Sequence, residues 1–274
     1  FKNLMKIRPV ILCGGAGTRL WPNTKKHQAK QFIDFGGWTL FGKTLNRIKN
    51  SLFDTPIIST NHRYIKEIKK ILKKYNVKEY RIILEPTKRN TGAAILSSSL
   101  IKEIPSAQPL IFLSSDHLID NVSKFNNQIK KNKKFLNSKN IFIFGIKPKI
   151  PSDQFGYFIS KKRNKLNKVS RFIEKPNLTK AKTIIRKGGY WNSGMFFIRK
   201  DSLINNFKKY QKKIYNYSFE AVNKSKFNNN IYYLNRKAFN KNPSKSFDYA
   251  ILEKTKNIYA IKLDIPWSDL GSWK

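Results

Sequence analysis

The chain of 274 residues has few cysteines, histidines and acidic residues, and it contains no long apolar run. Its single cysteine, Cys13, excludes an internal disulfide framework and is typical of a reducing compartment. With three histidines and no Cys/His cluster, a zinc site is not expected. No apolar run approaches the roughly 18 residues of a membrane helix, and we find no signal-peptide pattern at the start. We therefore expect a cytoplasmic protein without a membrane partner.

The scarcity of acidic residues gives the chain a formal net charge of +40, from 56 Lys and Arg against 16 Asp and Glu. Such a charge can indicate a nucleic-acid-binding protein. However, 45 of the basic residues are lysines and only 11 are arginines, and they are scattered in short clusters such as 130–134. Dedicated nucleic-acid surfaces usually use arginine for bidentate contacts. We favour AT-rich codon bias as the cause, and expect anionic small ligands rather than a specific nucleic-acid partner.

Short apolar runs alternate with amphipathic stretches over the first 150 residues. The pattern predicts strands at 8–13, 55–60, 80–85, 110–113 and 141–146, and helices at 40–48, 65–75 and 90–104. Continuous apolar strands separated by amphipathic helices favour an α/β protein with a doubly wound, mostly parallel sheet. In such sheets ligands bind beyond the carboxyl ends of the strands.

The second half of the chain is less regular. We expect strands at 157–161, 169–174, 194–199 and 258–263, and a polar, mainly helical region with long loops at 201–245. Neither a repeat nor a Pro/Gly/Ser linker is present, so the sequence favours one domain, 1–274, with an elaborated second half.

A glycine-rich turn, residues 14–19, follows the first predicted strand. It is not the dinucleotide-binding fingerprint, because Leu20 occupies the place of the third glycine, and no Gly-Lys-Ser/Thr of a P-loop follows. Glycines allow the backbone N–H groups to approach phosphates closely. With Arg19 and Lys30 nearby in sequence, the turn is a candidate triphosphate site; the alternative is an ordinary tight turn.

Two carboxylates are candidates for holding a cation. Asp116 follows the predicted strand 110–113, where an acidic side chain is well placed to bind Mg²⁺ over bound phosphates, although a helix cap explains it equally well. Asp269 lies in a turn far along the chain and offers a second carboxylate. His117 is more simply explained as a structural residue.

Three polar residues in the second half are candidates for binding a sugar phosphate. Glu174 and Lys175 end a predicted strand just before Pro176, so the carboxylate could accept from sugar hydroxyls and the ammonium could meet a phosphate. A solvated strand end is the alternative. Asn192 lies among aromatic residues, which suits a sugar, although a buried turn explains it nearly as well.

Taken together, these motifs resemble those of the sugar-phosphate nucleotidyltransferases, and most closely the mannose-1-phosphate guanylyltransferases. The resemblance covers residues 8–273 nearly continuously, with the motifs in family order. They comprise Gly14-Gly15-Ala16-Gly17-Thr18-Arg19-Leu20-Trp21-Pro22, Lys30-Gln31-Phe32, Glu85-Pro86-Thr87-Lys88-Arg89-Asn90-Thr91, Ser115-Asp116-His117, Phe144-Gly145-Ile146-Lys147-Pro148, Phe172-Ile173-Glu174-Lys175-Pro176, Tyr190-Trp191-Asn192-Ser193-Gly194-Met195-Phe196, Asp248-Tyr249-Ala250 and Trp267-Ser268-Asp269-Leu270-Gly271-Ser272-Trp273. Any one motif is modest evidence, but the ordered series is highly specific.

The resemblance implies a Rossmann-like nucleotidyltransferase fold and a transfer of GMP from GTP to mannose 1-phosphate. The products would be pyrophosphate and GDP-mannose, a precursor of polysaccharides and glycans. The implied phosphate-binding and catalytic residues are Gly14, Gly15, Gly17, Thr18, Arg19 and Lys30. The guanine side of the nucleotide pocket would be lined by Glu85, Asn90 and Thr91, and Mg²⁺ would be held by Asp116 and Asp269. The sugar phosphate would be bound by Gly156, Glu174, Lys175 and Asn192.

The sequence departs from the family pattern at a few positions. Ala29 replaces the usual proline before the Lys-Gln pair, and Gly92 and Ala93 stand where the family prefers alanine and proline, which bears on base selectivity. Family members continue beyond the last motif, so we expect this domain to be incomplete at its C-terminus. A homo-oligomer remains open. The alternatives are a guanylyltransferase for another sugar 1-phosphate, such as a heptose, and a catalytically weak fragment that binds nucleotide sugars.

Overall fold

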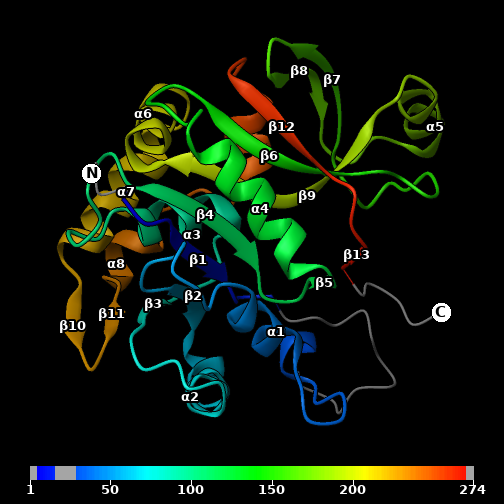
Figure 1. Cartoon of the computed structure of the whole chain (residues 1–274). Coiled ribbons are helices and arrows are strands. Elements are labelled where there is room, and N and C mark those ends of the chain that lie inside the picture. The colour runs from blue at the N-terminus through cyan, green and yellow to red at the C-terminus, as the bar shows by residue number, and fades with distance from the viewer. Residues whose placement is uncertain (1–4, 16–28, 270–274) are drawn as a thin grey trace.

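The computed structural model describes residues 5–15 and 29–269, and one large sheet runs through them (Figure 1). The strand order is β10-β11-β3-β2-β1-β4-β9-β6-β12-β8-β7. The bounds are β1 Arg8–Leu12, β2 Ile57–Asn61, β3 Arg81–Glu85, β4 Pro109–Ser114, β6 Ile141–Ile146, β7 Tyr157–Arg163, β8 Leu166–Ile173, β9 Tyr190–Arg199, β10 Lys226–Asn228, β11 Ile231–Tyr233 and β12 Ile258–Leu263. A separate small sheet pairs β5, Leu118–Ile119, with β13, Trp267–Ser268.

The sheet is mixed, so the expectation of a mostly parallel sheet is wrong in this detail. Strands β11, β3, β2, β1 and β4 are parallel neighbours, as are β6 and β12. Strand β9 lies antiparallel between β4 and β6, and β7 and β8 form an antiparallel pair at one edge. A buried strand is apolar whichever way it runs, so the sequence of β9 carried no signal of its direction.

Helices cover both faces of the sheet, which gives three layers (Figure 1). Their bounds are α1 Leu40–Arg47, α2 Ile65–Lys74, α3 Asn90–Ser99, α4 Val122–Lys133, α5 Leu178–Arg186, α6 Lys200–Tyr210, α7 Lys212–Asn223 and α8 Arg236–Phe239, with short turns η2 Lys30–Phe32, η3 His62–Tyr64 and η4 Asp248–Leu252. Residues of α1, α2, α4 and α5 join one core cluster, and residues of α3, α6, α7 and α8 join the other. Adjacent strand residues such as Val10 and Ile11 enter opposite clusters, because side chains alternate between the faces of a strand.

The region 201–245 contains more than helices and loops. Helices α6 and α7 agree with the prediction, but β11 pairs in parallel with β3 and extends the sheet, and β10 adds an antiparallel edge. These strands are only three residues long, and they lie in a stretch rich in lysine and asparagine. The residues of β11, Ile231-Tyr232-Tyr233, are of types that favour strands, but a run of three is too short to predict a strand by itself. Strand β11 forms where the edge of β3 is available to pair with it.

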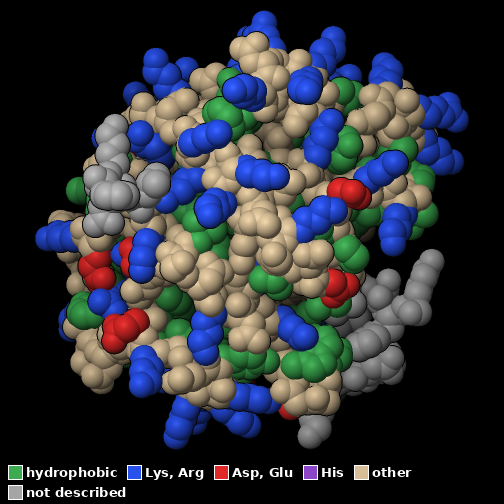
Figure 2. All heavy atoms as spheres, viewed as in Figure 1, with side chains coloured by type: hydrophobic (Ala, Val, Ile, Leu, Met, Phe, Trp, Pro, Cys, Tyr) green, Lys and Arg blue, Asp and Glu red, His purple; other side chains and the backbone are tan. Residues whose placement is uncertain are grey.

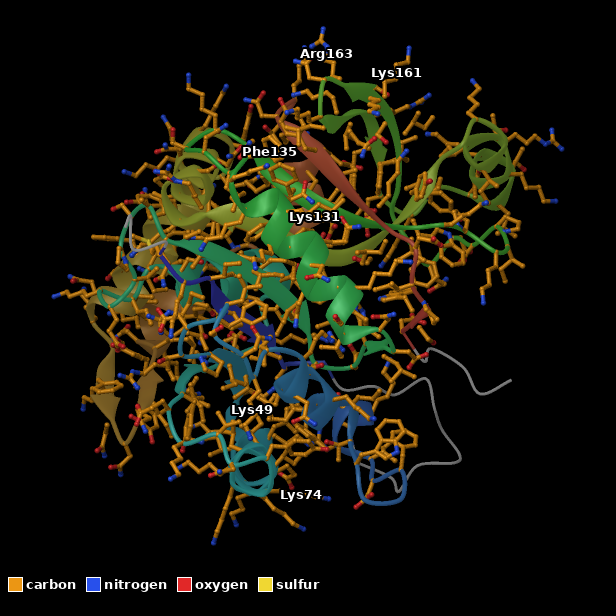
Figure 3. The ribbon with its side chains drawn as sticks, in the orientation of Figure 1. Lys49, Lys74, Lys131, Phe135, Lys161 and Arg163 are labelled. Atoms are coloured by element: carbon orange, nitrogen blue, oxygen red, sulfur yellow. The ribbon has the colours of Figure 1, made fainter. Side chains whose placement is uncertain are left out.

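Basic side chains are spread over the visible face of the molecule without gathering on one element (Figure 2). Figure 3 labels examples on separate parts of the fold: Lys49 and Lys74 near α1 and α2, Lys131 on α4, and Lys161 and Arg163 at the far end of β7. In the part of the chain that the structure describes, none of the helices is both long and apolar enough to cross a bilayer.

Candidate active site

A pocket of about 310 Å³ opens at the carboxyl ends of β1, β3 and β4. Its lining comes from many elements: Leu12, Cys13, Gly14, Gly15, Gln31, Ser59, Glu85, Lys88, Asn90, Thr91, Ala94, Ser114, Ser115, Asp116, His117, Ser193, Gly194, Phe196 and Asp248. This is the edge at which a parallel α/β sheet usually binds its ligand. Gly14, Gly15, Glu85, Asn90, Thr91 and Asp116, all predicted site residues, line this one pocket.

Glu85 places a buried carboxyl group in the pocket wall. The Ser59 hydroxyl donates a hydrogen bond to Glu85 Oε1 at 2.8 Å. Burial raises the pKa of Glu85 to about 7, although the Ser59 hydrogen bond opposes the shift. Glu85 can therefore act as a hydrogen-bond donor or an acceptor near neutral pH. Cys13, beside it, is buried, and burial raises the pKa of its thiol to about 12, so it packs as a neutral group.

The first turn of α3 joins the pocket to a distant segment of the chain. Asn90 adopts a φ of 63°, and its side chain accepts a hydrogen bond from the Thr91 N–H at 2.9 Å. The Thr91 hydroxyl accepts a hydrogen bond from the Phe247 N–H at 2.9 Å. Thr91 thus fixes the position of Asp248, which follows Phe247 and also lines the pocket.

Lys30, Asp116 and Asp269 meet at one end of the pocket. Lys30 Nζ lies 3.0 Å from Asp116 Oδ2 and also donates a short hydrogen bond to the backbone carbonyl of Asp269. The β5–β13 pairing explains the meeting, because Asp116 lies just before β5 and Asp269 just after β13. The same ammonium group therefore contacts the carboxylate of one predicted metal ligand, Asp116, and the main chain of the other, Asp269. Lys30 itself is buried rather than open to solvent.

The donor set at this end of the pocket suits Mg²⁺ in its chemistry. Burial raises the pKa of Asp116, but His117, Lys30 and the Ser114 hydroxyl lower it more, so this carboxyl group is ionised at neutral pH. Carboxylate and phosphate oxygens are the ligands that Mg²⁺ prefers, and the ionised Asp116 carboxylate faces the pocket in which the phosphates of a nucleotide would lie. Among residues 5–15 and 29–269, His, Cys, Asp and Glu side chains form no metal-binding group of three or more. A cation here would have the Asp116 carboxylate, oxygen atoms of Asp269 and ligand phosphates as its ligands.

The predicted sugar-phosphate residues form a second group. The Asn192 N–H donates to the Gly156 carbonyl at 2.7 Å, and a Cβ on Gly156 would lie 2.5 Å from Glu174 Oε2. Gly156 therefore leaves room for the Glu174 carboxyl group. Lys175 has a φ of 45°, which turns the chain directly after Glu174. Burial and the nearby Asp248 carboxylate raise the pKa of Glu174 to about 7, although the charge of Lys175 lowers it.

Asp248 is a site residue to which the sequence had assigned no role. The Asn192 side chain donates from Nδ2 to Asp248 Oδ1 at 2.8 Å. Since Asp248 also lines the nucleotide pocket, it connects that pocket with the predicted sugar-phosphate-binding residues. Burial raises the pKa of Asp248 to about 6. The one available signal was its position within a family motif, since an acidic residue before an apolar run has no distinctive pattern. Ser59 and Ser193 likewise carried no signal.

Three predicted phosphate-binding residues, Gly17, Thr18 and Arg19, lie outside the described residues. The start of their loop is described: the side chain of Gln31 donates from Nε2 to the Gly15 carbonyl at 3.1 Å. This bond ties η2, which carries Lys30, to the glycine turn.

The fold and the site are those of an enzyme class that transfers nucleotidyl groups. The family model described as nucleotidyl transferase matches residues 8–274, and the chain belongs to this family. It is 34% identical to a mannose-1-phosphate guanylyltransferase of Escherichia coli, an alignment that covers 97% of this chain and 60% of the relative. It is 33% identical to the xanthan biosynthesis protein XanB of Xanthomonas campestris, covering 97% and 58% of the two chains.

Solved structures agree with the fold. A Helicobacter pylori protein named mannose-6-phosphate isomerase superposes with a TM-score of 0.84 at 29% identity, covering 96% of this chain and all of that one. The present chain spans about three-fifths of the length of the curated relatives it matches.

Proposed function

We propose that this chain transfers GMP from GTP to mannose 1-phosphate, giving GDP-mannose and pyrophosphate. The observation that carries the proposal is the contact of Lys30 with the carboxylate of Asp116, which lines the same pocket as the glycine turn, and with the main chain of Asp269. An ammonium group beside an ionised carboxylate, with a second acidic residue next to them in the fold, suits a polyphosphate bound with a divalent cation. The choice of guanine as the nucleobase and of mannose as the sugar is taken from the names of the relatives.

This reaction requires the protein to position the two substrates and to neutralise negative charge, and it requires no general base. An oxygen of the mannose 1-phosphate phosphate group attacks the α-phosphorus of GTP, and the bond from that phosphorus to the bridging oxygen of the β-phosphate breaks. The nucleophile is already anionic, so no proton needs to be removed. Lys30 would lie against the charge that develops on the transferring group. When bound, Mg²⁺ would neutralise phosphate charge, held by Asp116 and Asp269.

The acceptor sugar would bind beside Gly156, Glu174, Lys175 and Asn192. Glu174 would accept hydrogen bonds from sugar hydroxyls, and Lys175 would meet the phosphate. Asn192 is held by Asp248 and the Gly156 carbonyl, so its amide is already oriented. At the other end of the pocket, Glu85 is able to donate or accept a hydrogen bond at the edge of the purine.

A pyrophosphate-release assay tests the proposal. GTP, ATP, CTP and UTP are each combined with mannose, glucose and heptose 1-phosphates in the presence of Mg²⁺. We expect turnover chiefly with GTP and mannose 1-phosphate. Asp116→Asn should abolish most of this activity, whereas Asp120→Asn, a matched change at an exposed carboxylate four residues away, should not.

Other outcomes would assign a different function. Preference for a heptose 1-phosphate would change the sugar but retain the chemistry. Nucleotide-sugar binding without pyrophosphate release would indicate a binding module. Interconversion of mannose 6-phosphate and fructose 6-phosphate without a nucleotide would indicate an isomerase and contradict the proposal.

A further inference from the structure

Arg47, the last residue of α1, is a buried cation without a carboxylate partner among residues 5–15 and 29–269. Its side chain is 1% exposed, and its Nε and Nη1 atoms have no hydrogen-bond partner within the part of the chain that the structure describes. Burial lowers the pKa of Arg47 to about 10, so it remains charged at neutral pH. Its guanidinium carbon lies 5.6 Å from the centre of the Phe125 ring.

A buried charge of this kind is a costly way to stabilise a fold. Taking a cation out of water is unfavourable, and even a buried ion pair can often be replaced by apolar side chains of similar volume without loss of stability. The two unpartnered nitrogen atoms add to that cost. A role for Arg47 outside simple packing would explain why the fold contains it.

A hydrogen bond from the Arg47 guanidinium leads to the active site. Arg47 Nη2 donates to the backbone carbonyl of His117 at 3.1 Å. His117 lies between Asp116 and strand β5, which pairs with β13 just before Asp269. The same helix contacts the other end of this turn, since the Thr44 hydroxyl lies 3.5 Å from the Ser114 carbonyl. Helix α1 thus holds both ends of the turn 114–117.

We propose that Arg47 is a positioning residue, which fixes the turn 114–117 so that Asp116 and Asp269 face one cation. This inference rests on the proposed function. Arg47 does not reach the pocket itself; it acts through the backbone of His117. Arg47 should therefore lower the stability of the fold and raise its affinity for the cation. The buried charge destabilises the fold, while the hydrogen bond to His117 orders the site.

The test compares three variants by thermal unfolding and by Mn²⁺ binding in the presence of GTP, followed by electron paramagnetic resonance. Arg47→Met removes both charge and donor, and Arg47→Lys retains a charged donor. Lys200→Met is the matched control: Lys200 is also buried, and its ammonium donates only to the carbonyls of Ile101 and Ile104.

We expect Arg47→Met to unfold at the same temperature as the parent or higher. It should nevertheless bind Mn²⁺ roughly ten- to a hundredfold more weakly, which is the usual effect of removing a residue that orients a metal ligand. Arg47→Lys should recover most of the affinity, and Lys200→Met should leave it unchanged. Unchanged Mn²⁺ affinity in Arg47→Met would overturn the inference. So would a lower unfolding temperature or a failure to fold, since Arg47 would then be structural. If the parent protein bound no Mn²⁺ with GTP, the proposed function would fail instead.

Discussion

Lys175 is the residue on which the proposed sugar-phosphate site depends most directly. It is exposed, and its positive φ turns the chain so that its charge acts on both Glu174 and Asp248. We predict that Lys175→Met raises the KM for mannose 1-phosphate by roughly ten- to a hundredfold, as expected for a charge-assisted contact worth about 1.5–3 kcal/mol. The KM for GTP should stay nearly constant.

Steady-state kinetics with each substrate varied in turn measures this difference. Lys180→Met, at another exposed lysine on the neighbouring helix α5, is the control and should change neither constant. An equal loss for both substrates would mean that Lys175 acts on the fold or on the nucleotide, and the sugar-phosphate site would be misplaced.

Glu85 should make stability depend on pH. Its pKa rises from 4.5 in the unfolded chain to about 7 in the folded protein, chiefly through burial. Between these values the folded protein binds more protons than the unfolded chain, so the free energy of unfolding falls as the pH rises. A shift of this size corresponds to about 3 kcal/mol, fully lost above pH 7.

The Glu85→Gln variant tests this, because glutamine can still accept the Ser59 hydrogen bond but does not ionise. Its stability relative to the parent should increase by about 3 kcal/mol between pH 4.5 and pH 8. Denaturant unfolding at several pH values measures the difference. The same change at the exposed Glu79 is the control, and a parallel pH dependence of parent and Glu85→Gln would refute the assignment.

At the scale of elements, helix α3 controls how closely the segment that carries Asp248 approaches the pocket. The Gly92 N–H donates to the Lys245 carbonyl at 3.0 Å, and a Cβ on Gly92 would lie 2.7 Å from that same oxygen. The alanine that the family prefers at this position therefore does not fit here unless the backbone at Lys245 moves. The glycine is a structural feature of this chain rather than a neutral departure.

We predict that Gly92→Ala destabilises the protein by about 1–3 kcal/mol, despite the better helix propensity of alanine. It should also raise the KM for mannose 1-phosphate, because Asp248 shifts with the displaced segment. Thermal unfolding and kinetics measure the two effects. Lys245→Ala leaves the contacting backbone carbonyl in place and should change neither the stability nor the KM. If Gly92→Ala were as stable as the parent, the segment around Lys245 would move aside at no cost, which would contradict the prediction.

The elements also differ in how well the sequence predicted them. Helix α2 has apolar residues at helical spacing, including Ile68 and Leu72. The predicted helix, 65–75, begins at the observed residue and ends one residue beyond the observed C-terminal end. The direction of β9 and the existence of β11 were not predictable. An apolar strand contains no information about its orientation. The three residues of β11 are of strand-favouring types, but so short a run forms a strand only where β3 is there to pair with it.

At the scale of the whole molecule, the charge of +40 should give only weak, non-specific binding to nucleic acids. On the face that Figure 2 shows, lysine and arginine side chains are scattered rather than gathered into one basic patch. Binding to duplex DNA should therefore depend on counterion release and be lost at moderate salt. Titration of labelled DNA at rising salt measures this, and tight, sequence-selective binding at physiological salt would contradict it.

The sequence by itself determined the alternation of strands and helices, the family, and which residues are candidates for the site. These features can be read from the sequence because hydrophobic periodicity and the order of motifs depend only on the positions of residues along the chain. Gly14, Gly15, Glu85, Asn90 and Thr91, which the sequence predicted for the nucleotide site, line one pocket, since the ends of neighbouring parallel strands meet at one edge of a sheet.

The tertiary structure alone decided the contacts between distant segments. Lys30 meets Asp116 and Asp269 because β13 pairs with β5, across nearly 150 residues of chain. Asp248 joins Asn192, and Arg47 supports the turn after Asp116, through contacts for which no spacing rule exists. These arrangements depend on sheet order and on burial, and both arise only when separate segments pack together.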